Sequence, residues 1–145
     1  MNIPAKRQIN GTFGAVHLNG IHFADIEELK ADIDIDRKTG QWAGSLGEDS
    51  KITGTKGSGS FKFKKVYSRE IAMIMPIIKT GKDFRPMLVT ELKDPEAYGA
   101  ERCVIEEIWF NNLPLIDFKV GDLVNKEIKF GFNPDNVEFE DIIEK

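Results

Sequence analysis

The chain of 145 residues has the length of one domain, expected to span 1–145, and leaves little room for a second. Its 20 basic and 24 acidic residues give a formal net charge of -4, which excludes the strongly basic composition typical of duplex-binding proteins. A single cysteine, Cys103, excludes internal disulfides and a cysteine-rich zinc site, and the longest apolar run, 71–78, is far too short for a stable membrane anchor.

The first predicted element is a β-hairpin around the Asn-Gly pair at 19–20, because both residues tolerate the positive φ of a type I′ turn. A two-residue loop places Leu18 opposite Ile21 on one face and His17 opposite His22 on the other. Two imidazoles do not complete a metal site without a third ligand. We therefore expect no metal or other cofactor.

The return strand is predicted to continue as one long, bent strand over 21–36, with a bulge or break near 25–27. Beyond the break its odd positions are apolar, and Ile33 and Ile35 are expected to fill the core. Its even positions form an acidic stripe along the other face. The members of this stripe are Asp32, Asp34 and Asp36.

Next comes a glycine-rich, weakly apolar segment, 37–50, which predicts a long exposed loop. Loops of this length are usually functional or disordered, and Trp42 inside this one suggests that the loop docks onto another surface. A strand is predicted over 51–67. Its first part is strongly basic, and acidic blocks lie before it and at the end of the chain, so the small net charge is a sum of separated blocks.

A single helix is predicted over 68–80. Ser68 can cap it, Glu70 favours its positive N-terminal end, and Gly81 can close it. Pro76 predicts a kink, or an end one residue earlier, because proline removes a backbone hydrogen bond. The apolar residues surround the helix axis, so the helix needs cover on more than one side.

The rest of the chain reads as β structure, with strands predicted over 84–93, 102–110, 113–120, 123–132 and 137–142. The last two alternate between apolar and polar residues, as half-buried antiparallel strands do. Apolar residues fall on both faces of 103–110, which indicates two apolar surroundings. The sequence therefore predicts a mainly β fold, an antiparallel sandwich or barrel with one flanking helix and a long loop.

The sequence contains no recognisable catalytic motif. Both histidines share one hairpin, and Cys103 lies in an apolar strand, so no nucleophile triad forms. The glycine-rich run 54–60 lacks the Gly-Lys-[Ser/Thr] ending of a phosphate loop. We expect a protein that is not an enzyme. A monomeric β-barrel that binds a small ligand is an alternative, consistent with the ten phenylalanines.

Several segments together resemble one known family. They are Ile9-Asn-Gly-Thr-Phe-Gly, Leu18-Asn-Gly, Ile52-Thr-Gly-Thr-Lys-Gly-Ser-Gly-Ser, Ser68-Arg and Asp94-Pro-Glu-Ala-Tyr-Gly-Ala-Glu-Arg. In this order and spacing the chain resembles the tail tube proteins of contractile phages and phage-tail-like particles. The resemblance implies a β-sandwich subunit with a flanking helix and no enzymatic activity. It also implies hexameric rings that stack into a hollow tube, which conducts DNA or pierces the target envelope.

The resemblance further implies partners and a location. The chain would assemble with itself and with tail sheath, tape-measure and baseplate proteins, and DNA would pass as a transient, non-sticking cargo. The protein would assemble in the host bacterial cytoplasm and belong to a virion or phage-tail-like particle.

Within such a tube, particular residues acquire expected roles. The acidic stripe Asp32, Asp34 and Asp36 is expected to face the lumen and to repel phosphate, with Glu138 and Glu140 as the competing choice. The loop 37–50 is expected to contact the next ring, and to be needed for stacking but not for folding. The residues expected at contacts between subunits are Trp42, Ile71, Ile74, Ile78, Ile108 and Trp109.

Overall fold

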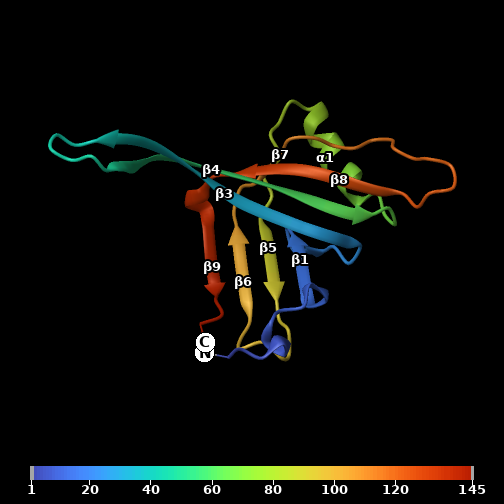
Figure 1. Cartoon of the computed structure of the whole chain (residues 1–145). Helices are drawn as coiled ribbons and strands as arrows, with labels where there is room; N and C mark the ends of the chain where they lie inside the picture. The colour runs from blue at the N-terminus through green and yellow to red at the C-terminus, as the bar shows by residue number, and fades with distance from the viewer. Residues whose placement is uncertain (1, 145) are drawn as a thin grey trace.

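The computed structural model describes residues 2–144, which form two antiparallel β-sheets and one helix (Figure 1). Sheet A has the order β2-β1-β5-β6-β9 and sheet B the order β3-β4-β8-β7. The strands of sheet A are β1 (Gly14–Leu18), β2 (Ile21–His22), β5 (Leu88–Leu92), β6 (Glu101–Ile105) and β9 (Val137–Asp141). The strands of sheet B are β3 (Ile26–Gln41), β4 (Glu48–Lys64), β7 (Trp109–Phe110) and β8 (Asn125–Phe132). The helix α1 spans Arg69–Lys79, and short 3-10 turns lie at Ala5–Arg7, Gly11–Phe13 and Pro134–Asn136. The prediction of a mainly β fold with one helix is confirmed.

The core lies between the two sheets, whose strands run across one another in Figure 1. Sheet B contributes a run of aromatic rings, because the odd positions of β4 and the even positions of β8 point to the same side. Sheet A contributes aliphatic side chains from β1, β5 and β6. The buried members are Val16, Leu18, Phe23, Phe61, Phe63, Leu88, Ile105, Ile108, Ile128, Phe130 and Phe132.

The first hairpin forms as predicted. Leu18 pairs with Ile21, His17 pairs with His22, and Asn19 at the turn has a φ of 49°. The two imidazole rings stack with centroids 4.8 Å apart. Among residues 2–144 no group of three or more histidine, cysteine or acidic side chains is placed to hold a metal ion.

The predicted long strand over 21–36 is two strands in different sheets. β2 ends at His22, and the chain crosses to sheet B before β3 begins at Ile26. Phe23 and Asp25 are buried at this crossing, which a continuous strand on a sheet edge would not require. The predicted irregularity near 25–27 is confirmed by a register shift between Ile26 and Glu28.

The predicted loop over 37–50 is wrong. β3 and β4 pair from Ile26↔Phe63 to Gln41↔Glu48, and only 42–47 forms the turn. β4 pairs with β8 only from Gly57 to Lys64. Residues 34–56 therefore form a two-stranded arm that projects beyond the sandwich (Figure 1). The segment from 48 to 56 alone corresponds to roughly 30 Å at about 3.3 Å per residue.

The predicted strand over 102–110 is divided between the two sheets, as is the strand predicted over 21–36. β6 belongs to sheet A and β7 to sheet B, and the crossing between them has Glu107 at a φ of 52° and Ile108 fully buried. A change of sheet explains why apolar residues fall on both faces. The strand predicted over 113–120 does not form, whereas β8 and β9 confirm the last two predicted strands to within two residues.

The helix begins and ends close to the predicted residues and continues through Pro76, so its predicted early end is wrong. Gly81, at a φ of 75°, closes the helix and donates from its N–H to the Ile78 carbonyl. Ser68 occupies the cap position without a side-chain hydrogen bond. Glu70 is not exposed at the helix start; it is buried and paired with Lys126.

Close backbone approach in sheet B depends on glycine at position 59. A Cβ atom there would overlap the Lys30 carbonyl oxygen and the Phe130 ring, whereas a Cβ at Gly40 in the arm meets nothing. We expect Gly59→Ala to lower the free energy of unfolding by about 1–3 kcal/mol, because the added atom overfills the core. Gly40→Ala is the matched control and should be near neutral in a denaturant titration. Equal stability of the two variants would contradict this packing.

Candidate functional site

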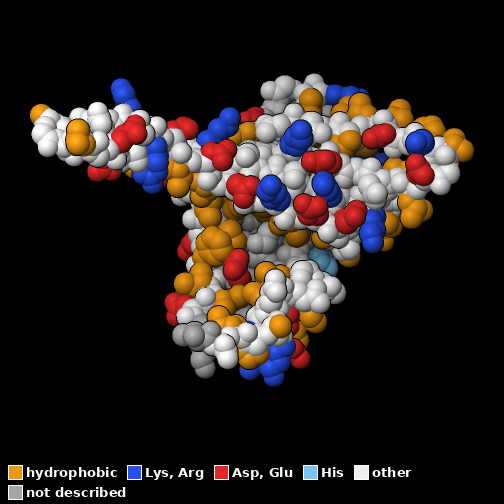
Figure 2. Space-filling view, viewed as in Figure 1, with side chains coloured by type: hydrophobic (Ala, Val, Ile, Leu, Met, Phe, Trp, Pro, Cys, Tyr) orange, Lys and Arg blue, Asp and Glu red, His pale blue; other side chains and the backbone are white. Residues whose placement is uncertain are grey.

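The outer face of sheet B is almost entirely polar. The even positions of β3 from Glu28 to Asp36, the even positions of β4 from Gly54 to Lys64 and the odd positions of β8 point to this side, away from the core. Acidic and basic residues occur there in equal numbers: Glu28, Asp32, Asp34, Asp36 and Glu127 against Lys30, Lys56, Lys62, Lys64 and Lys129. In Figure 2 red and blue side chains alternate across this face.

The three predicted stripe residues, Asp32, Asp34 and Asp36, do share this face, and all three are exposed. The stripe is not isolated, however, because β4 places lysines beside it. Asp34 pairs in register with Lys56, and Asp32 lies 3.7 Å from the Lys30 ammonium. Lys56 could not be found without the strand register, whereas Lys30 lies on the same strand as the stripe, and both make the face mixed in charge.

The opposite side of the arm is apolar and uncovered. Ile33 and Ile35 are 44% and 52% exposed, so the prediction that they fill the core is wrong. They continue the core-facing side of β3, but the arm extends past the end of sheet A and has nothing to pack against. Ile52 on β4 is 48% exposed. Figure 2 shows orange side chains in the hollow between sheet B and sheet A.

The tip of the arm presents two large apolar side chains to solvent. Trp42 is 77% exposed and Leu46 is 99% exposed. The turn itself is ordered by hydrogen bonds, since Ser45 N–H donates to the Trp42 carbonyl and the Gln41 side chain donates to the Leu46 carbonyl. The tip therefore holds an exposed indole in a defined turn.

The other predicted contact residues divide into two groups. Ile74 and Ile108 are 1% and 0% exposed and pack inside the subunit, so neither can touch a neighbour, and this expectation is corrected. Ile71 is half-buried and Ile78 is exposed on α1. Trp109 is half-buried on the edge strand β7, where the Arg85 guanidinium lies over its ring.

The two edges of sheet B differ in how much backbone they leave free to pair with another strand. β3 forms one edge over its full length. The other edge carries the short strand β7, and beyond it the Asn112 side chain donates to the Glu127 carbonyl and accepts from the Lys129 N–H. Asn112 thus occupies backbone groups of β8 that an incoming strand would use.

A second protrusion was missed by the sequence reasoning. Residues 111–124 connect β7 to β8 and extend from the end of sheet B opposite the arm (Figure 1). Most of the apolar side chains in this connection are strongly exposed: Leu115, Ile116, Phe118, Val120 and Leu123. The sequence signal was an apolar segment that begins with Pro114 and is interrupted by Gly121.

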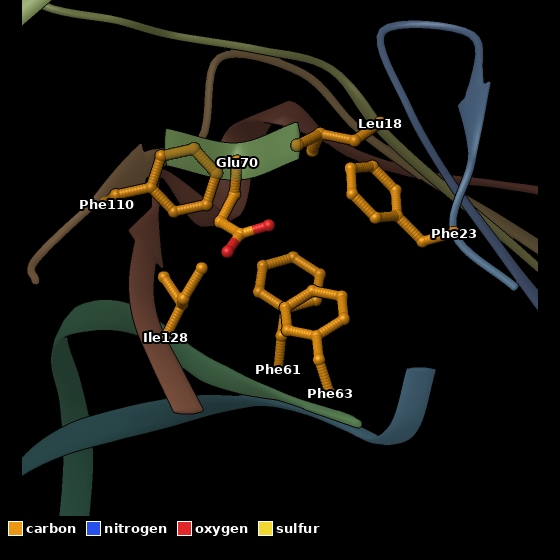
Figure 3. Close-up of a pocket in the computed structure, with 7 residues that line it drawn as sticks. All are labelled: Leu18, Phe23, Phe61, Phe63, Glu70, Phe110 and Ile128. Carbon is orange, nitrogen blue, oxygen red and sulfur yellow. The ribbon is translucent and has the colours of Figure 1, made fainter. Parts of the chain in front are cut away.

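The interior offers little space for a ligand. The cavity between the sheets is about 10 Å³ and is lined by apolar side chains and Glu70 (Figure 3). Pockets for small molecules measure about 300–1,000 Å³. The sheets also remain separate and do not close into a barrel. The alternative of a ligand-binding barrel gains no support here.

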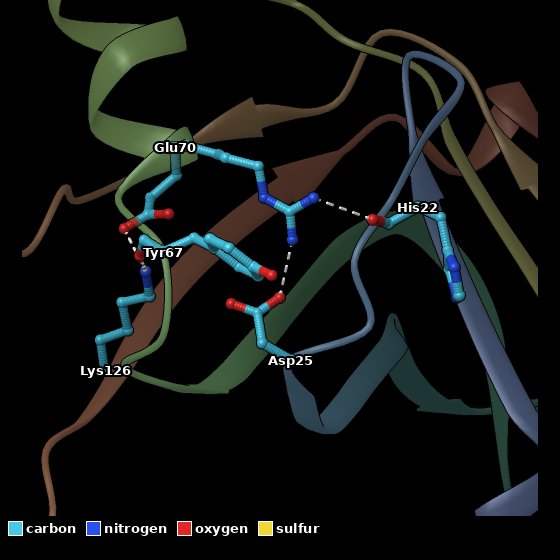
Figure 4. Close-up of polar contacts among 6 residues, drawn as sticks. His22, Asp25, Tyr67, Glu70 and Lys126 are labelled. Atoms are coloured by element: carbon cyan, nitrogen blue, oxygen red, sulfur yellow. Dashed lines mark hydrogen bonds and ion pairs between the residues drawn. The ribbon is translucent and has the colours of Figure 1, made fainter.

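Two ion pairs fix α1 to the sandwich (Figure 4). The Arg69 guanidinium donates to the Asp25 carboxylate at 3.1 Å and to the His22 carbonyl at 3.2 Å. The Lys126 ammonium donates to the Glu70 carboxylate at 2.5 Å and to the Tyr67 carbonyl at 2.6 Å. Because Glu70 and Lys126 are both almost fully buried, each charge depends on the other.

A third polar cluster holds the N-terminal segment on the far end of sheet A. The Asp94 carboxylate accepts from the backbone N–H groups of Glu96 and Asn10. Arg7 donates to the Glu96 carbonyl and lies over the Tyr98 ring. The Asp-Pro-Glu-Ala-Tyr segment that contributes to the family resemblance thus has a structural task in this chain.

The hydrogen bonds from Glu96 and Asn10 lower the pKa of Asp94 below its ordinary value of 3.8. A lowered pKa means that the carboxylate stabilises the fold above its unfolded pKa, and that this stabilisation is lost as the pH falls through the folded value. We therefore expect an NMR titration to place the Asp94 midpoint below 3.8, with the Asn10 and Glu96 amide signals following it. A midpoint at or above 3.8 would contradict these bonds.

Two other groups have shifted pKa values. Hydrogen bonds to Glu140 and Glu91 raise the pKa of Arg102, and the same contacts link β5, β6 and β9. Burial raises the pKa of the Cys103 thiol, with a smaller contribution from Glu101. A raised pKa disfavours the thiolate, which is the reactive form of cysteine.

Within residues 2–144 no helix is long and apolar enough to cross a membrane.

Known proteins share both sequence and architecture with this chain. A family model described as phage tail tube protein matches residues 1–141. The phage-like element PBSX protein XkdM of Bacillus subtilis (strain 168) is 26% identical over 134 residues, 91% of each chain. The uncharacterized protein YqbM of the same strain is equally similar, with 26% identity over 134 residues and 91% of each chain.

Solved structures with the same fold come from contractile systems. The terminating cap of the anti-feeding prophage tube superposes with a TM-score of 0.70 at 11% identity, covering 97% of this chain and 95% of that one. A chain of the sheath-tube complex of an extracellular contractile injection system superposes at 0.65 and 11% identity, with 97% and 93% coverage. These likenesses extend the family match to the fold.

Proposed function

Because the chain belongs to the phage tail tube protein family, we propose that it forms the inner tube of a contractile phage tail or phage-tail-like particle. In this proposal hexameric rings of the subunit stack into a hollow tube. The tube conducts DNA or pierces the target envelope. The role is structural and involves no catalysis.

The arm is the observation that carries this proposal. A two-stranded hairpin alone is marginally stable in water, and an arm with exposed Ile35, Trp42 and Leu46 leaves apolar area that its own subunit does not cover. Contacts with other copies of the chain would cover it. Exposed apolar area of this kind is typical of a surface that contacts another protein.

Rings require two different surfaces on each subunit that fit one another. Sheet B offers the free edge of β3 on one side and β7, with Trp109, on the other. Neighbours that meet through these edges would continue the sheet around the ring and leave no edge exposed. Ile71 and Ile78 on α1 remain further candidates for contact with a neighbour.

The outer face of sheet B is the proposed lining of the channel, which keeps Asp32, Asp34 and Asp36 as lumen-facing residues. A water-filled channel favours a polar face, and the opposite side of the sheet is apolar. With lysines beside the acids, the face holds no net charge. DNA would then slide because nothing attracts it strongly, and not because acids repel it.

Tail sheath, tape-measure and baseplate proteins are the expected partners of the tube. The subunit would assemble in the cytoplasm of the bacterial host and remain in the finished virion or phage-tail-like particle.

Light scattering followed by electron microscopy of the purified protein tests this proposal. We expect rings or tubes of uniform width at high protein concentration. A Trp42→Ser, Leu46→Ser variant is the control for nonspecific aggregation, because it should fold normally and lose the tubes. A parent protein that remains monomeric at every concentration would contradict the proposed function.

A further inference from the structure

The two protrusions of the subunit lie at opposite ends of sheet B. The arm tip leaves one end of the strands, and the 111–124 connection leaves the other (Figure 1). A second copy displaced along the strand direction would therefore bring its arm tip to the 111–124 connection of the first. A single displacement of this kind would cover the arm tip and the 111–124 connection together.

The receiving surface is a groove beside the 111–124 connection. Its apolar lining consists of Pro114, Leu115, Ile116, Phe118 and Val124, and Lys65 lies on its rim. Ile116 and Phe118 are 84% and 71% exposed in the subunit. These side chains offer the apolar area that an exposed indole and a leucine need for burial.

Charge also favours this pairing. The segment 41–50 around the arm tip carries Glu48 and Asp49 and no basic residue. Lys64 ends β4 and Lys65, the next residue, lines the groove; neither forms an ion pair with any residue in 2–144. The groove lining also includes one acid, Asp117, and one further base, Lys126, which is paired with Glu70. A tip seated in the groove would bring the two acids toward the two lysines.

We propose that the arm tip of one subunit, with Trp42 and Leu46, docks into the 111–124 groove of a second copy in the next ring. This inference rests on the proposed tube function and assigns its axial contact. The contact joins two different surfaces, so it repeats from copy to copy without closing. Repetition of this kind produces a stack of rings that can grow at both ends.

Disulfide trapping tests the contact directly, because Cys103 is the only native thiol. A Leu46→Cys, Ile116→Cys variant in a Cys103→Ala background is assembled, oxidised and run on a non-reducing gel. We expect a ladder that continues beyond the number of subunits in one ring. The matched control, Leu46→Cys with Ile142→Cys, uses an exposed residue just after β9, outside the groove, and should give no ladder.

Charge reversal gives a second, independent readout. Lys64→Glu with Lys65→Glu should raise the protein concentration needed for tubes about tenfold, and adding Glu48→Lys with Asp49→Lys should restore it. Tubes that form without the 46–116 link and ignore both reversals would overturn the docking inference while leaving the tube function intact. A ladder that stops at one ring would also overturn it. Failure of the unmodified protein to form rings or tubes would remove the proposed function and this inference together.

Discussion

We expect a variant with a shortened arm to remain folded and no longer to form tubes. The variant joins Arg37 to Ile52 through an Asn-Gly pair, which copies the turn of the first hairpin, because Arg37 and Ile52 already pair in register. The removed residues contribute nothing to the core between the sheets. We expect the melting temperature to change by only a few degrees and tube formation to be lost completely.

Circular dichroism and electron microscopy of the same preparation measure the two outcomes. The Gly40→Ala variant, which keeps the arm and adds a side chain in open space, serves as the control and should still form tubes. Tubes of normal length from the shortened protein would show that the arm does not stack rings. An unfolded product would show instead that the arm stabilises the subunit.

Breaking the buried ion pair of Glu70 and Lys126 should give the largest loss of stability in the molecule. Both side chains are almost fully buried, so removing one partner leaves an uncompensated charge in the core. Such losses cost about 3–5 kcal/mol. For Glu70→Leu we expect a fall in melting temperature of about 10 °C or more.

A double-mutant cycle separates the pair from simple packing. Glu70→Leu with Lys126→Met removes both charges and should recover most of the stability that each single variant loses. The exposed pair of Arg85 and Asp83 is the control, since its removal should cost less than about 1 kcal/mol. Additive losses in the buried pair would contradict the coupling.

Local chemistry explains what the sequence predicted well. The Asn-Gly turn and the alternation around it determine the first hairpin, and the alternation in β8 and β9 determines two more strands. Gly81 marks the end of α1, as its positive φ requires. In each case the signal lies within a few residues of the element.

The errors have a different origin. Residues 37–41 and 48–50 pair through their backbones while both faces remain exposed, so no apolar alternation reveals the strands of the arm. The changes of sheet depend on distant partners: Arg69 contacts Asp25 in the crossing at 23–25, and the Pro86 carbonyl accepts from the Ile108 N–H in the crossing at 106–108. The acidic stripe was found from its spacing, but the position of Lys56 beside it is set by the register with β4.

In the proposed assembly the subunit builds a hollow tube whose channel is lined by the outer face of sheet B. A cryo-electron microscopy reconstruction of the assembled protein tests it most directly. We predict stacked rings in which Asp32, Asp34 and Asp36 face the channel and Ile35 faces away from it. Rings that place these aspartates in subunit contacts, or on the outside of the tube, would contradict the account.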